Sequence, residues 1–129
     1  MISYPPIDMH KKKSEALVIH CADPRFQPAY RHVIDSLNKY IDLLVSPGAS
    51  KAVVDDKNKL EYIKLLYGLH QFDEVHVMDH VECGAFGPVD DETKAHGKML
   101  EQATSKIKAA LPELKVFPHL LGEKGEISL

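Results

Sequence analysis

Short runs of consecutive apolar residues alternate along this chain with longer segments in which apolar residues recur at helical spacing. Four mainly apolar runs, at 16–19, 43–45, 75–78 and 114–117, are short enough to be strands. The run 16–19 has no polar interruption, which is typical of a parallel strand that is covered on both faces. The sequence therefore predicts four strands, of which the first is buried.

The segments between these runs predict three helices, at about 28–37, 60–67 and 91–111. Pro28 suits the first turn of the first helix, and Asp55 or Asp56 is available to cap the second. The third helix should end at Pro112 and bury Met99, Ala103, Ile107, Ala110 and Leu111. Segment 46–50 should be a turn, and the tail from 120 an extended segment that turns at 124–125. Strands that alternate with helices predict an α/β fold, a mostly parallel central sheet flanked by helices.

Length and composition narrow the class of protein. The chain has 129 residues, of which 44% are hydrophobic and 27% charged, so we expect one globular domain over residues 1–129. A net charge of -3 gives no electrostatic footprint for a nucleic-acid partner. No stretch approaches the roughly 18 apolar residues of a membrane span, and no signal peptide is visible. We therefore expect a cytoplasmic protein with neither nucleic acid nor membrane as a partner.

Polar segments follow three of the predicted strands, where ligands bind in parallel sheets. Two of these segments contain both cysteines of the chain, Cys21 and Cys83, and a histidine, His80, spaced His-x-x-Cys. Two thiolates and one imidazole can hold zinc and leave its fourth position open. Each residue alone would more often be an ordinary buried cysteine or histidine, but their combination at strand ends favours a metal site. A Cys21–Cys83 disulfide or redox pair is less favoured, because the compartment is expected to be reducing and the cysteines lack Cys-x-x-Cys spacing.

Asp23 and Arg25 follow Cys21 closely. Alternation along an extended segment would place positions 21, 23 and 25 on one side, so that Arg25 could hold the Asp23 carboxylate beside the metal. The alternative is an ordinary surface ion pair. Asp79, next to His80, is expected to cap a turn, and the alternative is that it contacts a metal ligand. His96 is expected to be a partly exposed residue of the long helix.

The Cys-x-Asp-x-Arg segment and the His-x-x-Cys-Gly segment about sixty residues later resemble those of the β-class carbonic anhydrases. The resemblance extends over most of the chain and implies zinc as the cofactor. It makes Cys21, His80 and Cys83 the zinc ligands and makes Asp23 and Arg25 a catalytic dyad. It also matches Gly48 and Gly84 to glycines that line the substrate pocket. Phe26, Gln27 and Phe86 are candidates for the rest of that pocket.

The activity that the resemblance implies is reversible hydration of carbon dioxide to bicarbonate by zinc-bound hydroxide, oriented by the Asp–Arg dyad. It also implies a homodimer or a higher homo-oligomer. Two alternatives stay open. One is a hydrolase of a related small molecule, carbonyl sulfide or carbon disulfide, and the other is a non-catalytic zinc-binding protein of the same fold.

Overall fold

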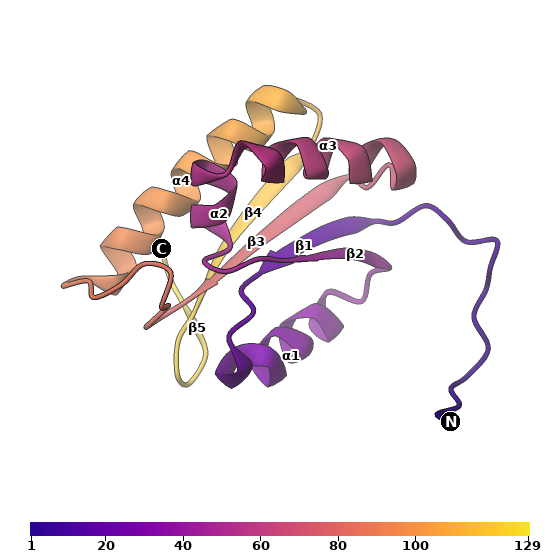
Figure 1. Ribbon diagram of the computed structural model, residues 1–129, viewed down its shortest axis with the longest axis horizontal. Helices are drawn as coiled ribbons and strands as arrows, with labels where there is room; N and C mark the ends of the chain where they lie inside the picture. The colour runs from indigo at the N-terminus through magenta and orange to yellow at the C-terminus, as the bar shows by residue number, and fades with distance from the viewer.

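The computed structural model describes residues 1–129 and has a mixed α/β fold built on a five-stranded sheet (Figure 1). In chain order its elements are β1 (Ala16–His20), a 3-10 helix (Pro24–Phe26), α1 (Gln27–Leu37), β2 (Ile41–Val45), α2 (Ser50–Asp55), α3 (Lys57–His70), β3 (Glu74–His80), α4 (Glu92–Ala110), β4 (Lys115–Leu121) and β5 (Glu126–Ile127). The strand order is β2-β1-β3-β4-β5, and only β5 is antiparallel to its neighbour. The predicted mostly parallel sheet with flanking helices is confirmed.

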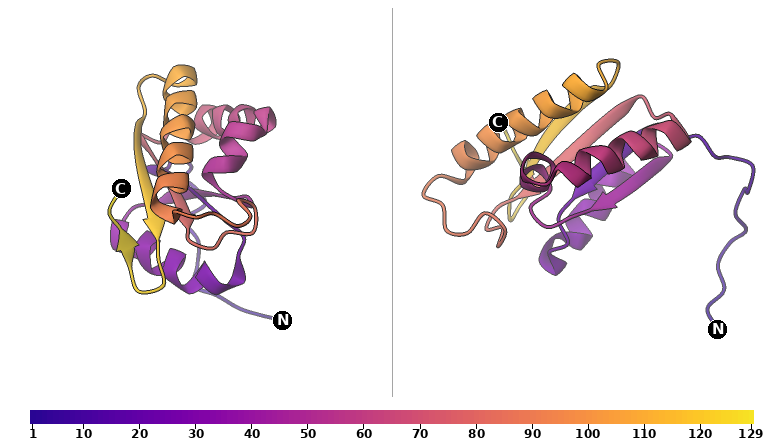
Figure 2. Two further views of the ribbon diagram at one scale, coloured as in Figure 1. Left: turned by 90° about the vertical axis from the view of Figure 1, so that its left-hand side faces the viewer. Right: turned by 45° about the horizontal axis from the view of Figure 1, so that its top comes forward.

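Helices cover both faces of the sheet. Helix α1 lies on one face, and α2, α3 and α4 lie on the other (Figures 1 and 2). Strand β1 shows the consequence, because Leu17 and Ile19 belong to the core under α2–α4 whereas Val18 belongs to the core under α1. All five residues of β1 and all seven of β3 are buried, as expected for central parallel strands that are covered on both faces.

The chain enters and leaves the helices largely as predicted. Asp56 caps α3 by accepting the backbone N–H of Asn58, and α4 ends just before Pro112. The tail turns where the N–H of Gly122 donates to the carbonyl of Gly125, which brings β5 back against β4. Residues 1–13 are exposed and extend away from the sheet (Figure 1). None of the helices combines the length and apolarity that crossing a bilayer requires.

The turn predicted at 46–50 is confirmed at 47–49, and Ser50 already belongs to the short helix α2. Two other local predictions were wrong. Helix α4 buries Leu100 rather than Met99, and its buried residues also include His96. Strand β4 continues past 117 through Pro118, which is tolerated because β5 pairs only with the last two residues of β4 and leaves it an edge strand at Pro118.

The parallel register places the polar segments at one edge of the sheet. His20, the last residue of β1, pairs with Val45 at the end of β2 and with Met78 of β3. Cys21 therefore follows β1 at the edge where β2 leads into segment 46–50 and where β3 ends at His80. The fold thus brings together three segments that are far apart in the sequence.

Candidate metal centre

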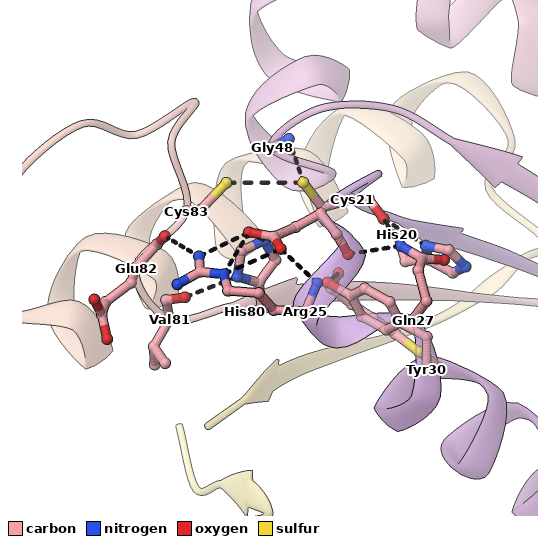
Figure 3. Close-up of polar contacts among 12 residues, drawn as sticks. His20, Cys21, Arg25, Gln27, Tyr30, Gly48, His80, Val81, Glu82 and Cys83 are labelled. Carbon is pink, nitrogen blue, oxygen red and sulfur yellow. Dashed lines mark hydrogen bonds and ion pairs between the residues drawn. The ribbon is translucent and has the colours of Figure 1, made fainter. Parts of the chain in front are cut away.

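Cys21, His80 and Cys83 meet beyond the ends of β1 and β3 (Figure 3). One ligand atom from each, two sulfurs and an imidazole nitrogen, lie within 4.8 Å of one another. Cys21 is 6% exposed, His80 1% and Cys83 4%, so bulk water has little access to their ligand atoms. This is the set of three residues that the sequence pattern selected.

The two sulfurs are spaced for a shared metal ion. The Sγ atoms of Cys21 and Cys83 lie 4.0 Å apart, and both thiols are free. A disulfide would require about 2.05 Å. Two thiolates that each lie about 2.3 Å from a tetrahedral zinc ion would be about 3.8 Å apart. The observed separation fits metal ligation.

His80 presents one ring nitrogen to the sulfurs and uses the other to fix its orientation. Its Nδ1–H donates to the backbone carbonyl of Val81 at 2.7 Å, which leaves the lone pair on Nε2. That Nε2 atom is buried and has no hydrogen-bond partner. The ring of Phe26 stacks on the imidazole with centroids 4.3 Å apart. A buried nitrogen without a partner beside two thiols is a place that a metal ion would fill.

The carboxylate of Asp23 lies at the rim of this cluster, with Oδ2 3.7 Å from Nε2 of His80. The route by which it reaches this place differs from the prediction. Asp23 caps the 3-10 helix Pro24–Phe26 by accepting the backbone N–H of Arg25 at 2.8 Å, so a tight turn replaces the expected extended alternation. Pro24, with its fixed φ, suits the first position of that turn.

The guanidinium group of Arg25 forms several hydrogen bonds with the carboxylate of Asp23. Its Nη2 donates to Oδ2 at 2.7 Å, and its Nε lies 3.1 Å from Oδ1 and 3.2 Å from Oδ2. These hydrogen bonds are the main reason why the pKa of Asp23 is lowered to about 2. The carboxylate is therefore ionised and fixed in direction at every pH near neutrality.

The loop after β2 closes over Cys21. The backbone N–H of Gly48 donates to the Sγ of Cys21 at 3.4 Å. Gly48 has φ +80°, and a Cβ there would lie 3.0 Å from the Cβ of Ala85, so both conformation and space require glycine. Gly84 differs, because a Cβ there would meet nothing within 4 Å. Burial raises the pKa of the Cys83 thiol, and a backbone N–H from Ala85 opposes that change.

The pocket candidates lie in different places. Gln27 donates through Nε2 to the carbonyl oxygens of Cys21 at 3.2 Å and Asp23 at 2.9 Å, so it holds the segment that carries both residues. Phe26 lies on His80, as described above. Phe86 packs on His96, with ring centroids 4.0 Å apart.

Sequence reasoning misjudged two buried residues behind the site. Asp79 does not merely cap a turn: its side chain is fully buried and bonds both Ser50, at the start of α2, and His96 of α4. His96 is 0% exposed, not partly exposed. Two signals could have found them: Asp79 is an ionisable residue at the end of a strand buried on both faces, and His96 falls on the same helical stripe as Leu100 and Ala103.

The fold and this cluster define a class: an α/β protein with a mostly parallel sheet and with two cysteines and one histidine, a candidate metal-ligand set, at the carboxyl ends of its strands. A family profile described as "Putative carbonic anhydrase" matches residues 11–129, and the chain therefore belongs to that family.

The chain is also similar to individual proteins, in sequence or in fold. The chain is 30% identical over 132 residues to an uncharacterized protein of Rickettsia conorii, covering 89% of this chain and 71% of the relative. It is also 30% identical over 139 residues to an uncharacterized protein of Rickettsia bellii, covering 89% and 80%. The crystal structure of a carbonic anhydrase from Streptococcus mutans is similar in fold, with a TM-score of 0.59 and 15% identity over 99% of this chain and 88% of that one.

Proposed function

We propose that this protein catalyses the reversible hydration of carbon dioxide to bicarbonate at a zinc ion held by Cys21, His80 and Cys83. The observation that carries the proposal is the position of Asp23, whose Oδ2 lies 3.7 Å from the partnerless Nε2 of His80 while Arg25 fixes its direction. A purely structural zinc site has four protein ligands and needs no arginine to orient a carboxylate.

Cys21, His80 and Cys83 would hold the zinc ion, and the chemistry that the ion would supply is an activated water that acts as the nucleophile near neutral pH. In the overall reaction, carbon dioxide and water give bicarbonate and one proton. Asp23 accepts a hydrogen bond from the attacking water and thereby aims an oxygen lone pair at the carbon of the substrate. Because its pKa is about 2, Asp23 orients the water but does not retain the proton, which must pass on to buffer.

Arg25 has two tasks in this scheme. Its hydrogen bonds hold Asp23 ionised and in one orientation, and its Nη2 also donates to the carbonyl oxygen of Glu82 at 2.9 Å (Figure 3). The same guanidinium group therefore connects the dyad to the segment between His80 and Cys83. A lysine could supply the charge but could not make this fork of hydrogen bonds.

The test is carbon dioxide hydration by stopped flow between pH 7 and 9, on protein whose zinc content has been measured, with Asp23→Ala as the key variant. We expect Asp23→Ala to retain zinc and to lose about 100-fold or more in turnover, since it removes the group that aligns the nucleophile. Asp90→Ala, which replaces an exposed aspartate, is the matched control and should behave as the wild type.

Two outcomes would contradict the proposal. One zinc per chain without turnover at any of these pH values would leave carbonyl sulfide, carbon disulfide or a non-catalytic site. Loss of zinc in Asp23→Ala would make Asp23 the fourth ligand of a structural site.

The proposal includes a homodimer. Strand β2 is an edge strand, and its Leu43 and Val45 are 50% and 44% exposed. An unpaired edge with exposed apolar side chains is suited to contact with a second copy. Light scattering on the eluting protein should give twice the mass of the chain, and a monomer at micromolar concentration would contradict this part of the proposal.

A further inference from the structure

A chain of buried polar contacts runs behind the metal centre, and the proposed chemistry does not use it. It begins at Ser50, passes through Asp79 and His96, and reaches Glu92 at the start of α4. Glu92 then accepts the backbone N–H of Glu82, which lies between His80 and Cys83. The contacts thus connect α2, β3 and α4 to the turn that carries two of the candidate ligands.

The centre of this chain of contacts is fully buried. The Oδ1 of Asp79 accepts the backbone N–H of Ser50 at 3.0 Å. Its Oδ2 accepts the Ser50 hydroxyl at 2.6 Å and the Nδ1–H of His96 at 2.7 Å. The side chains of Asp79 and His96 are both 0% exposed. A carboxylate buried so deeply and with every partner in place is rigid.

His96 also contacts Glu92 and so connects it to the buried Asp79. Its Nε2 lies 3.1 Å from Oε2 of Glu92, so each ring nitrogen of His96 faces a carboxylate oxygen. Phe86 covers the imidazole ring and excludes water from it. Glu92 is thereby held in one orientation although its side chain is 30% exposed.

Glu92 contacts the turn between His80 and Cys83, whose backbone conformation is unfavourable. Glu82 has φ +54°, a left-handed conformation that is unfavourable for a residue with a side chain. Its N–H is held by Oε1 of Glu92 at 3.1 Å, and its carbonyl oxygen by Nη2 of Arg25 at 2.9 Å. Glu92 therefore fixes the N–H of Glu82 and Arg25 fixes its carbonyl group. Both contacts lie immediately before Cys83 in the chain.

We propose that Glu92, anchored by His96 and Asp79, is a positioning residue that holds Cys83 in place for the metal ion. The inference rests on the ligand set of the proposed function but not on the reaction. It explains why a partly exposed glutamate is bonded on both carboxylate oxygens, one to the turn and one to a fully buried ring. Loss of Glu92 should free the left-handed turn to relax and carry Cys83 away from Cys21 and His80.

The test compares Glu92→Ala with Glu92→Gln and with Glu101→Ala, a control at an exposed glutamate of the same helix. The readouts are the zinc affinity in competition with a chromophoric chelator, the absorption spectrum of the cobalt-loaded protein and the Tm of the zinc-free protein. Glu92→Gln keeps an oxygen that accepts the N–H of Glu82, whereas Glu92→Ala removes it.

We expect Glu92→Ala to bind zinc about 10- to 100-fold more weakly and to alter the cobalt–thiolate absorption, as loss of a group that orients a metal ligand does. Glu101→Ala should stay within about twofold of the wild type, as a substitution without a lost contact does. Glu92→Gln keeps the acceptor for the N–H of Glu82 and should lose clearly less zinc affinity than Glu92→Ala. Glu92→Ala also takes away the oxygen that the buried Nε2 of His96 faces, so the Tm of this zinc-free variant should fall as well. A role in stability alone would lower that Tm and leave the zinc affinity and the cobalt spectrum unchanged.

Equal zinc affinity of Glu92→Ala and Glu101→Ala would overturn the inference, and so would a loss of affinity that Glu92→Gln shares. A zinc-loaded wild type without carbon dioxide hydration would contradict the proposed function, whereas the order of zinc affinities would still decide the role of Glu92. The two failures are therefore distinguishable.

Discussion

Replacing Asp79 with alanine should destabilise the fold strongly, although Asp79 lies beside the metal centre and not in it. The substitution removes the acceptor of three donors: the N–H and hydroxyl of Ser50 and the Nδ1–H of His96. Ser50 and His96 are both 0% exposed, so bulk water cannot reach the donors that are left. The hydroxyl can rotate toward another acceptor, but the N–H of Ser50 and the ring of His96 are fixed.

The loss in the free energy of unfolding can be estimated from the donors that lose their acceptor. Leaving a buried donor unpaired costs about 1–3 kcal/mol, so two fixed donors cost about 2–6 kcal/mol. We take the middle of that range, about 3–5 kcal/mol, as the expected loss. The unfolding entropy of a chain of 129 residues is about 0.27 kcal/mol per kelvin, so a loss of 3–5 kcal/mol lowers the Tm by about 10–20 °C.

The assay is thermal unfolding by circular dichroism on reduced protein with chelator present, so that metal binding does not contribute. Asp79→Asn is the graded variant, because its amide keeps one acceptor oxygen, and it should lose less stability than Asp79→Ala. Asp90→Ala, at an exposed loop position, should stay within about 0.5 kcal/mol of the wild type. A Tm lowered by less than about 4 °C in Asp79→Ala, equivalent to about 1 kcal/mol, would contradict this prediction. It would mean that Ser50 and His96 find other partners.

Three further predictions concern the dyad, the effect of acid and the metal. Arg25→Lys should bind zinc as the wild type does but lose about tenfold or more in kcat, because lysine cannot hold Asp23 through a fork of hydrogen bonds; equal kcat values would contradict this role. Burial is the main cause that lowers the pKa of His20 and of His76 below 6.5, so the unfolded chain binds more protons and the zinc-free protein should lose stability as the pH falls from about 6.5. Urea midpoints between pH 7.5 and 5 should show this decline, His76→Gln should reduce its slope, and a midpoint independent of pH would be inconsistent with it. Zinc at 1,000 times its Kd should stabilise the wild type by about 4 kcal/mol, and Cys83→Ser should abolish most of that gain; an unchanged Tm on zinc addition to the wild type would count against the metal centre.

The sequence by itself determined the framework of the protein. An uninterrupted apolar run such as Ala16–Ile19 can be buried only between two layers, and the alternation of such short runs with helical segments implied a parallel sheet covered on both faces. Because the carboxyl ends of parallel strands share one edge, the same pattern implied that Cys21, His80 and Cys83 would meet. The dyad of Asp23 and Arg25 is also a local feature, since it forms within one tight turn.

Tertiary structure alone decided the supports of the site. Nothing in local sequence pairs Asp79 with Ser50 and His96, which lie 29 and 17 residues away, because their contact depends on how α2 and α4 pack against β3. The left-handed conformation of Glu82 likewise depends on two distant side chains, Arg25 and Glu92, that hold its peptide groups. Periodicity and residue type report which positions are buried and which can bind a metal. The pairing of buried polar groups is set by packing distances and hydrogen-bond directions that exist only once the chain has folded.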